Sequence, residues 1–221
     1  MTERPLSTFY AIFKAVKRWI YWTFYFPLRV RYERFRLRHQ TRQRSPLRIV
    51  VGASGVYELD WLPTDIHLLN MLRHEDWNEY FAPSSIDAIL AEHVWEHLTP
   101  EQALHCAINC RIYLRTGGYL RIAVPDGFHP NPSYIENVRP GGSGLGADDH
   151  RVLYTYQSLS QLLEQAGFTV NLLEYFDETG TFHNAEWDPQ DGMVHRTWRF
   201  DERNRDGKPH YTSLLADAFK R

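Results

Sequence analysis

Apolar residues along this chain come in short runs that end in turns, and segments with helical spacing separate most of these runs. Buried strands are predicted for the apolar runs at residues 47–51, 85–92, 119–125 and 168–176. Helices are predicted over residues 99–115 and 155–167. Two last strand candidates, residues 193–200 and 211–219, follow without a helix between them. This order predicts an α/β fold whose sheet is mostly parallel and has an antiparallel C-terminal edge.

Residues 1–45 carry a different pattern and are predicted to be a helical extension of a domain that spans residues 46–221. Apolar residues recur in the extension at helical spacing: the stripe holds Phe9, Ile12, Phe13, Val16, Ile20 and Phe24. Lys14, Lys17 and Arg18 lie off this stripe. The extension is therefore predicted to be amphipathic, aromatic and basic.

Charge is distributed unevenly along the chain. Residues 1–48 hold twelve Lys or Arg and two Asp or Glu, whereas the remainder holds 13 and 25. A basic amphipathic helix suits an anionic membrane surface, so peripheral membrane contact through residues 8–38 is one hypothesis. Packing of the stripe on the rest of the protein, or on a second copy in a homodimer, is the other. No nucleic-acid-binding motif accompanies the arginines, so nucleic acid is not expected as a partner.

Two further features bear on the cellular location. The sequence has no span of about 20 apolar residues, and basic residues interrupt the only apolar run near its N-terminus, as a signal peptide would not. Its two cysteines, Cys106 and Cys110, lie four residues apart within a predicted helix, where we expect them to be packing thiols. A cytoplasmic protein is predicted, with peripheral membrane binding as the addition that the basic helix suggests.

The stretch AEHVWEHLTPEQ, residues 91–102, contains a pattern that some zinc peptidases use. In those enzymes, residues placed like His93, Glu96 and His97 share one helix, and both imidazoles bind zinc. Here Thr99 and Gln102 form a capping box, which predicts that the helix starts only at Thr99. The histidines would then follow the carboxyl end of a strand, where open α/β sheets bind ligands, and no metal site is predicted.

A glycine turn and an acidic residue mark the next candidate ligand contacts. The turn GASG follows the first predicted strand, and residues 61–72 hold one or two short strands with Asp65 near the end of the first. In nucleotide-binding sheets, an acidic residue at the tip of the second strand binds the ribose hydroxyls. The dinucleotide motif G-x-G-x-x-G is absent, and about ten residues leave little room for a crossover helix.

From residue 47 onward the sequence resembles the class I S-adenosylmethionine-dependent methyltransferases, in particular small predicted members with an EHVWEHL motif. The segments that carry the resemblance are residues 85–88, 91–98, 114–127, 150–154, 163–168, 175–183 and 211–220. The resemblance implies a Rossmann-like methyltransferase sheet, a transferase that methylates a small-molecule or lipid-linked acceptor, and S-adenosyl-L-methionine as cofactor.

The resemblance also implies which residues bind that cofactor. Its methionine part would lie against Gly52, Ala53, Ser54 and Gly55 of the glycine turn. Asp65 would hold the ribose, Asp76 and Trp77 would flank the adenine, and Glu92 and His93 would lie beside the sulfonium. For Trp77 the alternative is a place in the core. For Glu96 and His97 it is capping of the following helix or pairing with each other.

Methyl transfer is an in-line displacement, so positioning supplies most of the catalysis. A hydroxyl acceptor would also use a base, and the catalytic candidates are His93, Asp126 and His150. Two alternatives stay open. One is a catalytically inactive binding or scaffolding module that keeps the methyltransferase fold. The other is the zinc peptidase.

Overall fold

A computed structural model describes residues 6–55 and 57–221 of the chain. These residues divide into two compact units, of which the first ends at Gln43 and the second is Arg44–Arg221.

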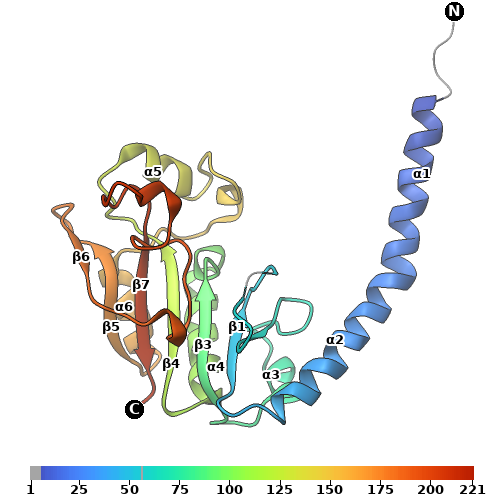
Figure 1. The fold of residues 1–221 in the computed structure, drawn as a ribbon, viewed down its shortest axis with the longest axis horizontal. Coiled ribbons are helices and arrows are strands. Elements are labelled where there is room, and N and C mark those ends of the chain that lie inside the picture. The colour runs from blue at the N-terminus through green and yellow to red at the C-terminus, as the bar shows by residue number, and fades with distance from the viewer. Residues whose placement is uncertain (1–5, 56) are drawn as a thin grey trace, which may run out of the picture. The chain divides into compact units, whose positions relative to one another are not determined.

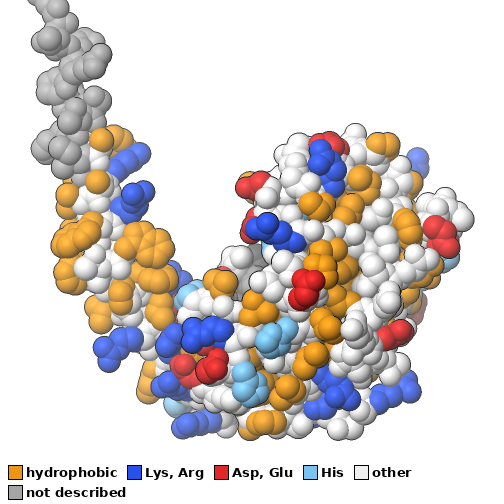
Figure 2. All heavy atoms as spheres, turned by 180° about the vertical axis from the view of Figure 1, so that it is seen from behind, with side chains coloured by type: hydrophobic (Ala, Val, Ile, Leu, Met, Phe, Trp, Pro, Cys, Tyr) orange, Lys and Arg blue, Asp and Glu red, His pale blue; other side chains and the backbone are white. Residues whose placement is uncertain are grey.

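The described residues of the first unit are helical from Leu6 to Thr41. Helix α1 (Leu6–Ile20) passes through one π-helical turn, η1 (Tyr21–Tyr25), into helix α2 (Phe26–Thr41) (Figure 1). Of the predicted apolar stripe, Phe13, Val16, Ile20 and Phe24 are exposed, whereas the side chains of Phe9 and Ile12 lie outside the described part. Figure 2 shows hydrophobic side chains along the described length of this helix, with Lys and Arg among them. Within residues 6–55 and 57–221, no helix combines the length and apolarity that a membrane crossing requires.

The second unit is built on one seven-stranded mixed sheet with the order β2-β1-β3-β4-β7-β5-β6 (Figure 1). Its strands are β1 (Arg48–Val51), β2 (Leu62–Pro63), β3 (Ile86–Glu92), β4 (Leu114–Pro125), β5 (Thr169–Phe176), β6 (Phe182–Asn184) and β7 (Ser213–Phe219). Neighbours among the first four are parallel, and β7, β5 and β6 add antiparallel pairs. The predicted fold class, an α/β sheet with an antiparallel C-terminal edge, is confirmed.

Local signals explain where the two longest helices of this unit begin. Helix α4 (Pro100–Tyr113) has Thr99 as N-cap in a complete capping box with Gln102, and α6 (Tyr156–Gln165) has a second capping box from Thr155. Both helices were predicted. The sequence reasoning missed α3 (His74–Tyr80) and α5 (Pro132–Val138), which have only seven residues each.

The two faces of the sheet are covered differently. Helices α4 and α6 contact each other and pack on β4 and β5. Alternate side chains of the central strands point to the opposite face and form a core cluster there. That cluster contains Val50, Ala88, Leu90, Ala123, Leu173 and Leu215 from the strands, and Trp61, Trp187 and Val194 from loops. The segment of residues 185–212, called the tail loop below, therefore supplies part of the core.

A buried arginine and a buried glutamate fasten the tail loop to the sheet. Arg121 on β4 makes two hydrogen bonds of 2.8 and 2.9 Å to the carboxylate of Asp217 on β7, and donates to the carbonyls of Asp188 and Gly192. Glu174 on β5 accepts from the indole N–H of Trp187 and from the Thr212 hydroxyl. Its carboxylate also accepts from the backbone N–H of Trp198.

The strand predicted at residues 193–200 was wrong. This part of the tail loop contains no strand, although Val194, Trp198 and Phe200 resemble an alternating apolar pattern. Three of its backbone N–H groups donate to side chains: Glu92 accepts from His195 and Arg196, and Glu174 accepts from Trp198. Carboxylates from distant parts of the chain replace the neighbouring strand that the pattern predicted.

Candidate functional site

A cavity of about 410 Å³ opens at the carboxyl ends of β1 and β3. Its volume lies in the range of small-molecule sites, roughly 300–1,000 Å³. The chain moves from β1 to β2 on one side and then returns to β3 on the other, so strand order reverses between β1 and β3. Open α/β sheets bind ligands in the crevice at such a reversal point. The cavity therefore lies where this topology favours a ligand site.

The turn after β1 forms one wall of the cavity with Gly52, Ala53 and Ser54. Gly52 has a φ of +63°, and a Cβ built on it would lie 2.7 Å from Cγ2 of Val94. Only glycine fits here without displacing a neighbour. Gly55, also predicted to bind cofactor, has a φ of +86° and does not line the cavity.

Glu92, at the end of β3, and His93, which follows it, also line the cavity. Glu92 accepts hydrogen bonds from the backbone N–H groups of His195 and Arg196, which hold the tail loop against the strand end. His93 has a φ of +56°, in the left-handed region that non-glycine residues seldom adopt. A backbone conformation of this kind persists only where surrounding contacts hold it.

Two polar contacts hold the His93 ring. Its Nδ1 lies 2.7 Å from Oε1 of the buried Glu96, and its Nε2 lies 3.0 Å from the Ser213 hydroxyl oxygen. With Glu96 ionised, Nδ1 carries the proton, so Nε2 accepts from the serine O–H. Both ring nitrogens are then hydrogen-bonded. His93 could accept a proton from a substrate only after the Ser213 hydroxyl moved away from Nε2. Ser213 itself is fully buried.

His150 presents a free nitrogen to the cavity. Its Nδ1 lies 2.7 Å from the carbonyl oxygen of Val138, which can only accept, so Nδ1 carries the proton. Nε2 keeps its lone pair and makes no hydrogen bond to any described residue. The rings of His150 and His97 meet edge-on with centroids 4.8 Å apart, and both residues line the cavity.

Acidic groups outnumber basic ones around this cavity. Glu58, Glu92 and Glu96 line it, against Arg196. Several histidines add groups that are neutral or positive. A cavity with excess negative charge attracts a cationic ligand.

Besides Gly55, three further predicted cofactor contacts, Asp65, Asp76 and Trp77, are not among the residues that line the cavity. The Asp65 carboxylate accepts from the N–H of Ile66, next to it in the chain. Asp76 accepts from the N–H of Asn70, and Trp77 is 0% exposed, stacked on Tyr113. The structure thus groups Gly52, Ala53, Ser54, Glu92, His93 and His150 in one cavity and leaves these three elsewhere.

Asp126, a predicted base, also lies outside the residues that line the cavity. Its carboxylate oxygens accept from the N–H groups of Phe128 and Phe176, which tie the end of β4 to β5. Burial raises the pKa of Asp126 to about 6, although these two N–H groups favour the charged form.

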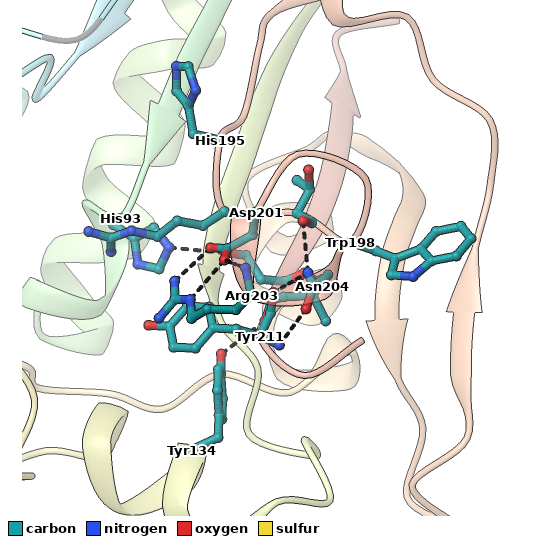
Figure 3. Close-up of polar contacts among 12 residues, drawn as sticks. His93, Tyr134, His195, Trp198, Asp201, Arg203, Asn204 and Tyr211 are labelled. Carbon is teal, nitrogen blue, oxygen red and sulfur yellow. Dashed lines mark hydrogen bonds and ion pairs between the residues drawn. The ribbon is translucent and has the colours of Figure 1, made fainter. Parts of the chain in front are cut away.

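Sequence reasoning missed several residues that line the cavity: Tyr57, Glu58, Trp61, Leu145, Met193, His195 and Arg196. Met193, His195 and Arg196 reach it because the tail loop folds back across the sheet. Figure 3 shows His93 beside the tail loop, where Asp201, Arg203, Asn204 and Tyr211 bond to one another, whereas His195 stands apart from that network. The anchoring contacts join residues up to 104 positions apart, so no local pattern could have revealed them.

The helix that the zinc peptidase hypothesis requires is not formed. His93 adopts a positive φ, and only a three-residue 3₁₀ turn, η2 (Trp95–His97), separates it from the start of α4. A different set of groups does meet at this point. One ligand atom each of Glu96, His97 and His150 lie within 4.8 Å of one another.

Comparisons with known proteins give likenesses of structure only. No family model and no curated protein sequence matches the chain. A SAM-dependent methyltransferase from Archaeoglobus fulgidus is 15% identical at a TM-score of 0.45, with 87% of this chain and 94% of that one covered. A possible histamine N-methyltransferase from Thermotoga maritima is 12% identical at a TM-score of 0.46, with 94% and 95% covered.

A third solved structure, phosphoethanolamine N-methyltransferase 2 of Haemonchus contortus with S-adenosyl-L-methionine, is 12% identical at a TM-score of 0.38. The match covers 58% of this chain but 34% of that enzyme, so the chain spans only a third of its length. At these identities and TM-scores, the structural likenesses do not support a function for this chain. The evidence for a function comes from the cavity.

Proposed function

We propose that this protein is an S-adenosyl-L-methionine-dependent methyltransferase that acts on a small or lipid-linked acceptor. The observation that carries the proposal is the cavity at the strand reversal, which a glycine turn, Glu92 and His93 all line. Turn N–H groups bind a carboxylate, and acidic side chains attract a sulfonium. Both groups belong to the methionine end of the proposed cofactor.

The proposal divides the cavity between donor and acceptor. The methionine part would lie along Gly52, Ala53 and Ser54, with the sulfonium towards the end of β3. The side that holds His97 and His150 would then receive the acceptor. Of the three predicted bases, only His150 both lines the cavity and keeps a ring nitrogen that is free for an acceptor or another ligand.

Two acidic residues are candidates for the contact with the ribose hydroxyls. Glu58 lines the cavity, whereas Asp65 does not. We expect Glu58→Ala to weaken donor binding by about 1–3 kcal/mol through loss of ribose hydrogen bonds. Asp65→Ala is the matched comparison. If donor binding weakens by that amount in Asp65→Ala alone, Asp65 and not Glu58 binds the ribose.

Calorimetric titration of the full chain with S-adenosyl-L-methionine and with its demethylated product tests the proposal. Saturable binding of both ligands is expected, and the Glu58→Ala variant controls for binding elsewhere. If the folded protein releases no heat with either ligand, over a range of temperatures, the proposal is wrong.

A second candidate, an inactive module that keeps this fold, is favoured by one specific feature. The described residues between β1 and β2, 52–55 and 57–61, contain no helix, whereas a crossover helix usually follows the first strand of a nucleotide-binding sheet. This module would bind donor weakly or not at all and would transfer no methyl group. The same titration, followed by a search for methylated products, separates the two candidates.

We further propose that α1 makes peripheral contact with anionic membranes. Phe13, Val16 and Trp19 are exposed and lie at helical spacing on a different side from Lys14 and Arg18. Binding to vesicles should rise with anionic lipid and fall with salt, by about 1 kcal/mol for each basic residue near the surface.

Charge reversal tests that contact in the full chain. Lys14→Glu/Lys17→Glu/Arg18→Glu should abolish vesicle binding, whereas Arg205→Glu/Lys208→Glu in the second unit should leave it unchanged. Equal vesicle binding by both variants would contradict the membrane contact. A concentration-dependent change of mass without vesicles would favour the homodimer instead.

A further inference from the structure

We propose that Glu96, His97 and His150 bind a divalent transition-metal ion of the zinc class. The proposal goes beyond methyl transfer and does not depend on it. It also differs from the zinc peptidase hypothesis, because it replaces His93 with His150 and needs no helix.

Proximity is the first observation. The three ligand atoms lie within 4.8 Å of one another. Zinc bonds of about 2.0–2.2 Å in tetrahedral geometry place ligand atoms roughly 3.4 Å apart. Closing that gap requires each ligand atom to move by about 1 Å, which small side-chain rotations supply.

The second observation is an unsatisfied carboxylate. Glu96 is 0% exposed. Its Oε1 pairs with Nδ1 of His93 at 2.7 Å, but its Oε2 is buried without a hydrogen-bond partner among the described residues. A buried oxygen with no partner costs free energy, and that cost is larger for a charged group. A bound cation would satisfy it.

The tautomer of His150 is the third observation. Its Nδ1–H is held by the Val138 carbonyl, so the Nε2 lone pair is available for a metal. Histidines that bind metals in proteins nearly always donate their other ring N–H to a carbonyl or carboxylate. Glu96 is supported in the same manner, since its second oxygen is held by His93.

His97 completes the group. Its side chain is 33% exposed, and its buried Nδ1 makes no hydrogen bond among the described residues, although an oxygen of Asp149 lies 3.5 Å away. Asp149 can stabilise the charge of a bound ion or approach as a fourth ligand. Two imidazoles with one carboxylate favour zinc and its first-row neighbours over magnesium or calcium, which prefer oxygen ligands.

Such an ion would change what the acceptor side of the cavity can do. Three protein ligands leave at least one coordination position, and all three residues line the cavity. An acceptor oxygen or nitrogen bound there would be polarised by the metal. His150 would then act as a ligand rather than a base, and the metal would lower the pKa of a bound hydroxyl so that its proton could pass to solvent. The ion would also join η2 to the loop with η3 (Ala147–Asp149), across the cavity.

Equilibrium titration of the chelator-treated full chain with zinc chloride, and separately with magnesium chloride, tests the proposal. One zinc per chain should bind at micromolar concentration or below, and magnesium should not compete. His150→Ala and His97→Ala should each weaken zinc binding at least tenfold. His195→Ala changes a histidine that lines the same cavity outside the group and should leave zinc affinity within about twofold.

Two further measurements protect this result against misfolding and other sites. Glu96→Gln keeps the shape of the side chain, and its circular dichroism shows whether a loss of binding reflects unfolding. Cobalt(II) should give a visible absorption band in the wild type that His150→Ala loses. No zinc bound by the folded wild type would refute the proposal and leave a water as the partner of Glu96. Unchanged affinity in both histidine variants would refute it too.

Discussion

Gly52 offers a direct test of the wall that the glycine turn forms. The Gly52→Ala substitution adds a methyl group to a residue with a φ of +63°, and that methyl would lie 2.7 Å from Cγ2 of Val94. The left-handed conformation costs an alanine about 1–2 kcal/mol. Overpacking against the stiff valine side chain adds about 1–3 kcal/mol. A total destabilisation of about 2–5 kcal/mol is therefore expected.

Gly55 supplies the matched control. It also has a positive φ, +86°, but a Cβ added there would meet nothing within 4 Å. Gly55→Ala should therefore show only the conformational cost, about 1–2 kcal/mol. For a unit of this size, each kcal/mol lowers the melting temperature by about 2–4 °C. Thermal unfolding followed by circular dichroism resolves the difference.

A double-mutant cycle isolates the contact with Val94. In Gly52→Ala/Val94→Ala the clashing methyl is gone, so the double variant should be more stable than the two single changes predict by about 1–3 kcal/mol. Additive effects, or equal destabilisation by Gly52→Ala and Gly55→Ala, would refute the close approach of the turn to Val94.

Three further predictions concern buried ionisable groups. Arg121→Met leaves the carboxylate of Asp217 buried without its partner and should destabilise the protein by about 3–5 kcal/mol in urea unfolding. Arg205→Met, at an exposed ion pair, should cost at most about 1 kcal/mol. Equal losses of stability in the two variants would contradict the anchoring role of Arg121. Burial raises the pKa of Asp126 from 3.8 to about 6, so its protonated form contributes stability that is present below about pH 4 and lost as pH rises through 6; a constant stability difference between wild type and Asp126→Asn over that window would be inconsistent with it. Burial also raises the pKa of the Cys106 thiol to about 12, and Cys110 is fully buried. Neither thiol should therefore react with a thiol reagent before the protein unfolds. Rapid labelling of the native protein would disprove this burial.

Elements whose determinants are local could be predicted from the sequence. The capping box at Thr99 fixed the start of α4, and the apolar runs located β1, β3, β4, β5 and β7. The short helices α3 and α5 and the edge strand β6 were missed, because three to seven residues give too little periodicity. Residues 193–200 of the tail loop were wrongly predicted as a strand, because the carboxylates that bind their backbone come from β3 and β5.

The candidate site also combines residues that local patterns predict with residues that only distant contacts bring there. Gly52 and His93 follow strands at their carboxyl ends, and strand ends can be read from the sequence. Met193 and His195 line the cavity only because the tail loop returns to it. Trp77 was assigned to the adenine by resemblance, while its surroundings make it a core residue that donates to the carbonyl of Met71. Its role in cofactor binding stays a prediction.

Glu92 contributes to this cavity in two ways, through its negative charge and through its hydrogen bonds to the tail loop. The resemblance places its carboxylate beside a cationic sulfonium, but both carboxylate oxygens already accept backbone N–H groups, of His195 and of Arg196. Those bonds hold the tail loop that carries Met193 to the cavity. A carboxylate that accepts two N–H groups can still attract a nearby cation. Glu92→Gln therefore changes more than the charge, because an amide has one accepting oxygen and would leave one of the two N–H groups unbonded. The shape of the cavity and its attraction for a sulfonium depend on the same residue.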